Sequence, residues 1–338
     1  MRWCCSLSIV VAAATVVAEP ARGQTVEDFY RGKTINFYIG NTVGGGYDLY
    51  GRFIAMHLGR YLPGRPNIVP VNMPGAGGLT MAGWLYRIAP RDGTAIAIAS
   101  QVLPIEQALG APSVQYDARR LSWIGRVAPV VEVSYTWHTS QTRTLADARQ
   151  RETVMGGINP TSNTVTYLRL LNSLAGTRFK IINGYPGTTE MHIAMERGET
   201  EGATKTWEAF KADNGDWLRD KKVNMLVQYA LTASPELPGV PLMSDLGRSE
   251  DDRQVLRFYM SGNELGRAIV TAPDVPPERL AALRTAVMTM LRDPEFLAEA
   301  KKRKVEIGPM PGQDVHKLID GILNVSPALI AAAKKARE

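Results

Sequence analysis

An order of elements that occurs twice constrains the fold of this chain most strongly: a short strand, a Gly-rich turn and an amphipathic helix. Residues 34–39 (TINFYI) are rich in β-branched and aromatic residues and predict a strand, and the turn NTVGGGYD over 41–48 leads into apolar residues at helical spacing. A second strand over 67–72, the turn MPGAGG over 73–78, another helix and a third strand over 94–99 follow. This order predicts a parallel α/β unit.

The same order returns in the second half of the chain, as a repeat of elements and not of sequence. Residues 153–156 and 179–182 are predicted strands, each followed by a turn and a helix; the turns are GINPTSN (157–163) and GYPGTTE (184–190). Further strands are predicted over 200–204 and 223–229. The repeated order predicts two α/β lobes of similar build.

The C-terminal part of the chain is predicted to be helical. Pro276-Pro277-Glu278 begins a long helix, and Asp293 and Ser326 have the character of N-caps, each followed by Pro. The natural arrangement returns this helical tail to the first lobe, so the chain crosses between lobes near 124–134 and near 256–266, and crossings that continue as strands make a hinge. These crossings divide the chain into a first lobe of 24–128 and 262–338 and a second lobe of 129–261.

The first 23 residues have the pattern of an export signal. Arg2 precedes an apolar run of about fifteen residues, which fits a signal peptide and is short for a membrane anchor, the alternative interpretation. Small residues allow cleavage between Ala18 and Gln24. The two cysteines of the chain, Cys4 and Cys5, leave with this segment, so the mature chain forms no disulfide. We therefore expect a periplasmic protein.

Composition and motifs argue against several classes of function. Lys+Arg number 39 and Asp+Glu 33, giving a net charge of +6, and no basic segment interleaved with aromatics indicates a nucleic-acid partner. The Gly clusters lack dinucleotide or Walker spacing, and the four histidines are scattered without a metal-binding spacing. No nucleophile, base and orienting group are recognisable together. The sequence therefore predicts neither catalysis nor a cofactor nor a metal.

The Gly-rich turns are the candidate binding elements. In a parallel α/β sheet ligands bind outside the carboxyl ends of strands, where each turn begins a helix with free N–H groups and a positive dipole end. Glycines let a ligand approach the backbone, and Thr and Ser in the second-lobe turns add neutral donors. The turns have almost no basic residues, which favours a carboxylate held by dipoles and hydroxyls. The alternative is tight packing and helix capping alone.

Two of the candidate residues allow two interpretations. Asp48 caps its own helix or faces the ligand, where it needs a protonated or amide group as partner. Trp207, beside a second-lobe turn, is a core residue or an aromatic wall of the cleft.

An ordered set of motifs resembles a known family. GGGYDLYGRFIAMHLG, NMPGAGGLTMAGWLY and APRDGTAIAI in the first half, and INGYPGTTEMHIAMERGETEGATKTW and PELPGVPLMSDL in the second, together resemble the periplasmic receptors of tripartite tricarboxylate transporters, the Bug-type solute-binding proteins. The resemblance covers nearly all of the mature chain. It implies a two-lobed periplasmic-binding-protein (Venus flytrap) fold, in which each lobe is a mixed, mostly parallel sheet flanked by helices.

The resemblance also implies a function and a site. It implies capture of a small carboxylate, such as a di- or tricarboxylate or an aromatic acid, in the cleft between the lobes, and delivery to a membrane permease of two subunits by a monomeric receptor. The chain departs from the commoner family form at Val43, at Tyr47 and in GGINPTSN, which leaves the particular ligand open. The candidate ligand-binding residues are Gly44, Gly45, Gly46, Tyr47, Asp48, Ala76, Gly77, Gly78, Ser100, Gln101, Asn159, Thr161, Ser162, Asn163, Thr164, Gly187, Thr188, Thr189 and Trp207.

Two rival functions stay open at this point. The first is a secreted two-lobed enzyme such as a hydrolase, which the missing catalytic set disfavours. The second is a binding module that presents the same receptor to a sensor kinase, which would have an indistinguishable sequence.

Overall fold

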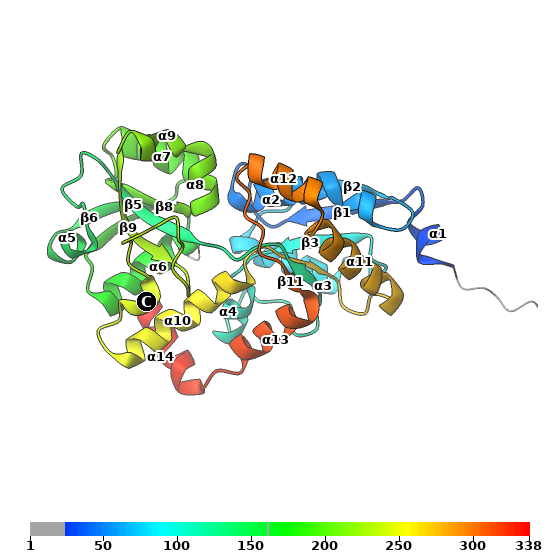
Figure 1. Ribbon diagram of the computed structural model, residues 1–338. Coiled ribbons are helices and arrows are strands. Elements are labelled where there is room, and N and C mark those ends of the chain that lie inside the picture. Colours follow the sequence, from blue (N-terminus) through cyan, green and yellow to red (C-terminus); the bar gives the residue numbers. More distant parts are fainter. Residues whose placement is uncertain (1–23, 161) are drawn as a thin grey trace, which may run out of the picture.

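The computed structural model describes residues 24–160 and 162–338, so the predicted signal peptide and its cleavage site lie outside the described residues. Two mixed sheets, each flanked by helices, stand side by side (Figure 1). The first sheet has the strand order β11-β4-β10-β3-β1-β2 and the second β7-β6-β8-β5-β9. The strands are β1 (Thr34–Ile39), β2 (Asn67–Asn72), β3 (Ala95–Ala99), β4 (Ser122–Arg126), β5 (Glu132–Trp137), β6 (Thr153–Gly157), β7 (Phe179–Asn183), β8 (Gly202–Thr206), β9 (Val223–Tyr229), β10 (Ala268–Thr271) and β11 (Met310–Pro311).

The helices occupy most of the sequence between the strands. They are α1 (Val26–Tyr30), α2 (Gly46–Leu58), α3 (Leu79–Arg87), α4 (Leu103–Ala108), α5 (Leu145–Gln150), α6 (Asn163–Leu170), α7 (Thr188–Glu196), α8 (Trp207–Asp213), α9 (Gly215–Arg219), α10 (Glu250–Leu265), α11 (Pro277–Met290), α12 (Pro294–Lys302), α13 (Gly312–Leu323) and α14 (Pro327–Arg337). Among the described residues no single helix has the length and apolar composition of a membrane span; α13 and α14 reach it only when taken together, across a bend of 82°.

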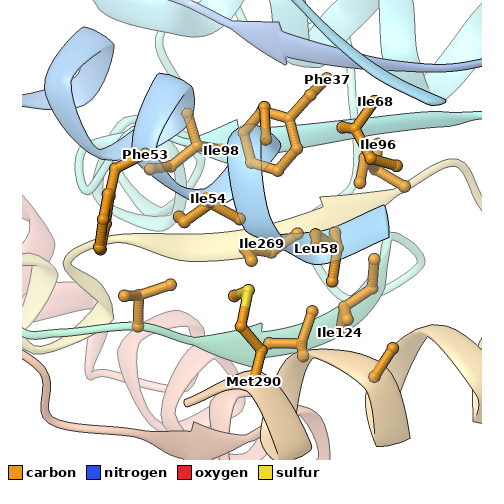
Figure 2. Packing of buried hydrophobic residues seen from close by; sticks show 14 of the residues in the cluster. Phe37, Phe53, Ile54, Leu58, Ile68, Ile96, Ile98, Ile124, Ile269 and Met290 are labelled. Atoms are coloured by element: carbon orange, nitrogen blue, oxygen red, sulfur yellow. The ribbon is translucent and has the colours of Figure 1, made fainter. Parts of the chain in front are cut away.

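The first sheet places two predicted turns at one edge. β1 pairs in parallel with β2 on one side and with β3 on the other, while β10 lies antiparallel between β3 and β4. Because β1, β2 and β3 run in the same direction, the predicted turns after β1 and β2 and the residues after β3 lie at the same edge of the sheet. Buried apolar residues such as Phe37, Ile98 and Ile269 pack against α2 and α11 and fix this arrangement (Figure 2).

The second sheet combines both directions of pairing. β6 is parallel to β7 and β8, whereas β5 is antiparallel to β8 and β9. The antiparallel register pairs Glu132, the first residue of β5, with Thr206, the last residue of β8. The amino end of β5 therefore lies at the same edge of the sheet as the carboxyl ends of β6, β7 and β8.

The predicted elements agree with the structure in most places. β1, β2 and β9 have the predicted bounds, and the side chains of Asp293 and Ser326 cap α12 and α14 as expected. The strand predicted over 200–204 corresponds to β8, which lies two residues later in the sequence.

The C-terminal tail departs from the predicted course. α11 and α13 pack on β4 of the first sheet, but α14 contacts α6 and α10 instead (Figure 1). Small buried residues of α14, Ala333 and Ala336, allow this close packing, and the Tyr259 hydroxyl donates to the Ala333 carbonyl at 2.9 Å. Near the second predicted crossing, α10 contacts α4 and α13 as well as α14, and the chain enters β10 shortly after α10 ends. The lobe boundaries stay a prediction, which places α14 in the first lobe although it packs on α6 and α10.

Candidate functional site

A cavity of about 340 Å³ lies between the two sheets, at the edge where both present the turns that lead into helices. The first lobe contributes the turn between β1 and α2 and the residues after β3. The second lobe contributes the starts of α6, α7 and α8 and the amino end of β5. The position corresponds to the carboxyl ends of parallel strands, where ligands of α/β proteins bind.

Each of the three consecutive glycines at the start of α2 meets a different requirement. Gly44 has a φ of +89°, which disfavours a side chain. Gly45 is the extended N-cap residue, with φ of −89°, and a Cβ there would meet no atom within 4 Å. At Gly46 a Cβ would lie 2.5 Å from Nη2 of Arg267 and 2.8 Å from Oγ1 of Thr206. All three glycines line the cavity.

Asp48 stabilises this turn and does not line the cavity. Its buried carboxylate accepts hydrogen bonds from the Gly44 N–H at 3.1 Å, from Arg52 Nε at 2.9 Å and from Asn72 Nδ2 at 2.9 Å. Burial acts to raise the pKa of Asp48, but the hydrogen bonds from Arg52 and Asn72 outweigh it and hold that pKa below its usual value. Of the two interpretations of Asp48, the structure favours the one in which its carboxylate stabilises the start of its own helix, α2.

Tyr47 and Gln101 link the first lobe to the start of β5. The Tyr47 hydroxyl donates to Oε1 of Gln101 at 3.0 Å and accepts from the Gln101 N–H at 2.8 Å. Nε2 of Gln101 donates to Oε1 of Glu132 at 3.0 Å. Tyr47 lines the cavity, whereas Gln101 lies behind the lining, so Gln101 acts on the site through Tyr47 and Glu132.

Glu132 is a buried acid in the cavity lining that the sequence analysis did not select. Its Oε1 accepts from Gln101 and also from Nδ2 of Asn163 at 3.1 Å. Burial raises the pKa of Glu132 to about 7, against the opposing effect of these hydrogen bonds and of Arg267. An acid inside the apolar stretch VVEVSY at a predicted crossing was the available signal.

The start of α6 uses its hydroxyls internally. The Ser162 hydroxyl donates to the Asn159 carbonyl at 2.7 Å and contacts the Thr164 hydroxyl at 2.8 Å, while Oγ1 of Thr164 accepts from the Ile158 N–H at 3.2 Å. These hydroxyls therefore shape the turn, although both residues line the cavity. Thr161 lies outside the described residues.

The start of α7 is more open. Gly187 is its N-cap, and Thr188 and Thr189 follow in the cavity lining. Among the described residues the Thr188 hydroxyl makes no side-chain hydrogen bond, so it is available to a ligand. The carboxylate of Glu190, which also lines the cavity, lies 3.2 Å from the position that a Cβ on Gly187 would take.

The basic groups near the cavity are engaged with carboxylates. Lys205 lines the cavity with part of its chain, but its Nζ donates to Asp213 at 2.7 Å and to Asn214 at 3.2 Å. Arg267, which is fully buried, forms an ion pair with Glu208. Since Arg267 precedes β10 and Glu208 belongs to α8, this pair joins the two lobes.

Trp207 belongs to the core and does not form a wall of the cavity. Its ring packs in the cluster around Phe210 and Trp217, and Nε1 donates to Oε2 of Glu236 at 2.6 Å. Its position directly after β8 turns the side chain away from the cavity, whereas the preceding residue, Thr206, lines it.

The structure brings most of the sequence-predicted residues together. The cavity is lined by the candidates Gly44, Gly45, Gly46, Tyr47, Gly77, Ser100, Ser162, Asn163, Thr164, Gly187, Thr188 and Thr189. The candidates outside the lining are Asp48, Ala76, Gly78, Gln101, Asn159 and Trp207. The lining residues outside the candidate list are Asn41, Thr42, Val43, Val102, Glu132, Ile158, Pro186, Glu190, Thr204, Lys205, Thr206 and Ala209. Within 24–160 and 162–338, no cluster of three His, Cys, Asp or Glu residues is arranged to hold a metal ion.

Comparison with known proteins identifies the fold. Neither the family models nor the curated proteins searched give a match to this sequence. Among solved structures, the periplasmic binding protein BugD aligns with a TM-score of 0.71 at 17% identity, over 91% of this chain and 98% of its own. An adipate-bound protein from R. palustris aligns at 0.68 and 19% identity (90% and 97%), and malate-bound MatC from Rhodopseudomonas palustris at 0.68 and 16% (90% and 99%).

These similarities define the class of the fold. The two mixed sheets with a cavity between them form the fold of the two-lobed periplasmic binding proteins. The predicted fold class is thereby confirmed.

Proposed function

We propose that this chain is an extracytoplasmic receptor for a small carboxylate, of the Bug type that serves tripartite tricarboxylate transporters. The observation that carries the proposal is the interlobe cavity, which receives the N-terminal ends of α2, α6 and α7. The first N–H groups of a helix lack intrahelical partners and the dipole is positive there, so three such ends favour an anion. The motifs that resemble this family occupy two of these turns.

The size and surroundings of the cavity support a small dicarboxylate. Its volume of about 340 Å³ is at the lower end of small-molecule sites. Two proteins of the same fold carry adipate and malate in their solved structures. We propose a ligand of this class for the present chain, held between the start of α2 and the start of α7.

The cellular setting forms part of the proposal. The N-terminal pattern supports export and cleavage between Ala18 and Gln24, and proteins of this fold include periplasmic binding proteins. In this setting the protein acts as a monomer that delivers its ligand to a membrane permease of two subunits. It carries out no reaction on the ligand.

A thermal-shift screen followed by titration calorimetry tests the function. Purified exported protein is heated with adipate, malate and citrate, and with the diamide of adipate as a neutral control. A ligand present at a hundred times its dissociation constant stabilises the folded state by about 2.7 kcal/mol. We expect at least one carboxylate to raise the melting temperature and the diamide to leave it unchanged. Equal shifts with the diamide, or conversion of the ligand detected by NMR, would contradict the proposal.

A further inference from the structure

The cavity contains a carboxylate at a place where an anionic ligand would meet it. Glu132 begins β5, is buried, and lines the cavity together with Asn163 and Tyr47. Both hydrogen bonds that it accepts, from Gln101 and Asn163, reach Oε1. Within the described part of the chain, Oε2 has no hydrogen-bond partner, which leaves it for the ligand.

Among the described residues, the buried cation that acts on this carboxylate is Arg267, which lowers the pKa of Glu132 but is shared with a second acid. Arg267, next to β10, is paired with Glu208 of α8. Lys205 of β8 binds Asp213, and the register that pairs Lys205 with Val133 places its side chain on the opposite face of the sheet from Glu132. With Glu132 ionised, two carboxylates and one guanidinium would therefore leave one uncompensated negative charge.

The other described side chains that face Glu132 add no positive charge. Tyr47 of α2, Tyr167 of α6 and Tyr229 of β9 face it with neutral hydroxyls, because burial raises the pKa of each tyrosine above its usual value. Asn263 of α10 bonds to Gln101 at 3.0 Å and is uncharged. From α7, Glu190 adds a further acid to the cavity lining. An ionised Glu132 would therefore repel a ligand carboxylate that enters the cavity.

We propose that Glu132 is the residue that makes ligand capture depend on a proton: the protein binds its carboxylate with Glu132 neutral, and Oε2 then donates a hydrogen bond to the ligand. This inference rests on the proposed carboxylate receptor function. Two carboxyl groups that share one proton avoid repulsion and gain a hydrogen bond. Binding then takes up one proton whenever Glu132 is ionised in the free protein.

The proton affinity of Glu132 agrees with this role. Burial raises the pKa of Glu132 to about 7. In the ligand-free protein the Glu132 carboxyl group is therefore protonated below pH 7 and ionised above it. A single proton taken up on binding makes the dissociation constant rise about tenfold for each pH unit above the pKa. The affinity is therefore constant in mild acid and falls as pH rises above 7.

Titration calorimetry between pH 6 and 9 tests the inference, with adipate and malate as probes. Both ligands are fully ionised above pH 7. Any proton that is taken up on binding in this pH range is therefore bound by a group of the protein. Buffers of different ionisation enthalpy report the number of protons. We expect close to one proton at pH 8 to 9 and a dissociation constant that rises about tenfold per pH unit.

Two variants separate this inference from a structural role for Glu132. Glu132→Gln keeps the size and supplies a permanent donor, so it should bind adipate or malate with little change from pH 6 to 9 and without proton uptake. Glu196→Gln, an exposed change on α7, should keep the wild-type pH profile. Circular dichroism confirms that both variants fold.

Different results would contradict the role of Glu132 and the proposed receptor function. Wild-type binding without pH dependence or proton uptake overturns the role of Glu132 and leaves the receptor function standing. Loss of all binding in a folded Glu132→Gln also overturns it, since the site would then require the ionised carboxylate and a cationic ligand group. Failure of wild type to bind adipate, malate or any other carboxylate at pH 6 overturns the proposed function and this inference with it.

Discussion

Gly45 is the glycine whose replacement separates ligand space from backbone conformation. Its φ of −89° is open to any residue, it lines the cavity, and a Cβ there would meet no atom within 4 Å. We expect Gly45→Val to weaken carboxylate binding at least tenfold, equivalent to about 1.4 kcal/mol or more, while the melting temperature stays within a few degrees. Titration calorimetry measures the affinity.

Two other glycines serve as controls for Gly45→Val. Gly321→Val, in α13 and far from the cavity, also meets open space and should leave binding intact. Gly46→Ala should destabilise the fold, because its Cβ would lie 2.5 Å from the buried Arg267 guanidinium. Normal binding by Gly45→Val would remove the α2 turn from the site.

Two of the buried acids near the site, Asp48 and Glu132, differ in how far their sequence context predicts them. Asp48 stands in the first turn of a predicted helix, so its role in that turn was one of two interpretations open from local sequence. Glu132 reaches the cavity only because β5 pairs antiparallel with β8 and thereby brings its first residue beside the last residue of β8. That pairing joins residues more than seventy positions apart, and no local pattern encodes it.

At the scale of single elements, the start of α2 depends on the charge of Asp48. The pKa of Asp48 is lowered in the folded protein, so its carboxylate contributes stability above the pKa of the unfolded chain and loses it as pH falls through the folded value. We expect Asp48→Asn to lower the free energy of unfolding by about 1.5 kcal/mol at pH 7. Urea unfolding should show this difference shrinking below pH 4, and a constant difference would contradict the account.

The starts of α6 and α7 are expected to respond differently to loss of a hydroxyl. Thr188→Ala removes an unengaged hydroxyl in the cavity and should weaken carboxylate binding about tenfold, at little cost in stability. Ser162→Ala breaks contacts within its own turn and should lower the free energy of unfolding by about 1 kcal/mol.

Calorimetry and thermal unfolding of Thr188→Ala and Ser162→Ala distinguish the two effects. Lys301→Ala is an exposed control that should change neither affinity nor stability. If Thr188→Ala binds as wild type, the start of α7 only caps its helix.

Element order could be predicted from the sequence, while the docking of elements could not. β1 and β9 have their predicted bounds because β-branched and aromatic runs are local signals. α14 was assigned to the first lobe, yet its alanines pack on α6 and α10 of the second, a choice made by tertiary fit. Trp207 shows the same limit, since its ring turns into the core although its neighbour lines the cavity.

At the scale of the whole molecule, the buried pair between Arg267 and Glu208 joins the two lobes. Both side chains lie in the interior, and a second bridge, from Lys211 to Glu306 at 3.0 Å, lies nearer the surface. Removing one partner of a buried ion pair leaves an uncompensated charge, at a cost of about 3–5 kcal/mol. We expect Glu208→Ala to lower the free energy of unfolding by this amount.

The control for Glu208→Ala is an exposed pair. Arg257 bonds to Glu250 at 2.7 Å with both side chains about half exposed, so Arg257→Ala should cost less than about 1 kcal/mol. Chemical denaturation of the two variants gives the comparison. Equal losses would mean that the interlobe pair adds no more than a surface ion pair.

The position of the bound carboxylate tests the central claim most directly. A crystal structure of the protein with the acid that stabilises it best should show one carboxylate in the interlobe cavity, within hydrogen-bond distance of the backbone N–H groups of Gly45 or Gly46 and facing Glu132. A carboxylate bound outside this cavity, for instance in the outer groove beside Lys301 and Lys304, would contradict the account.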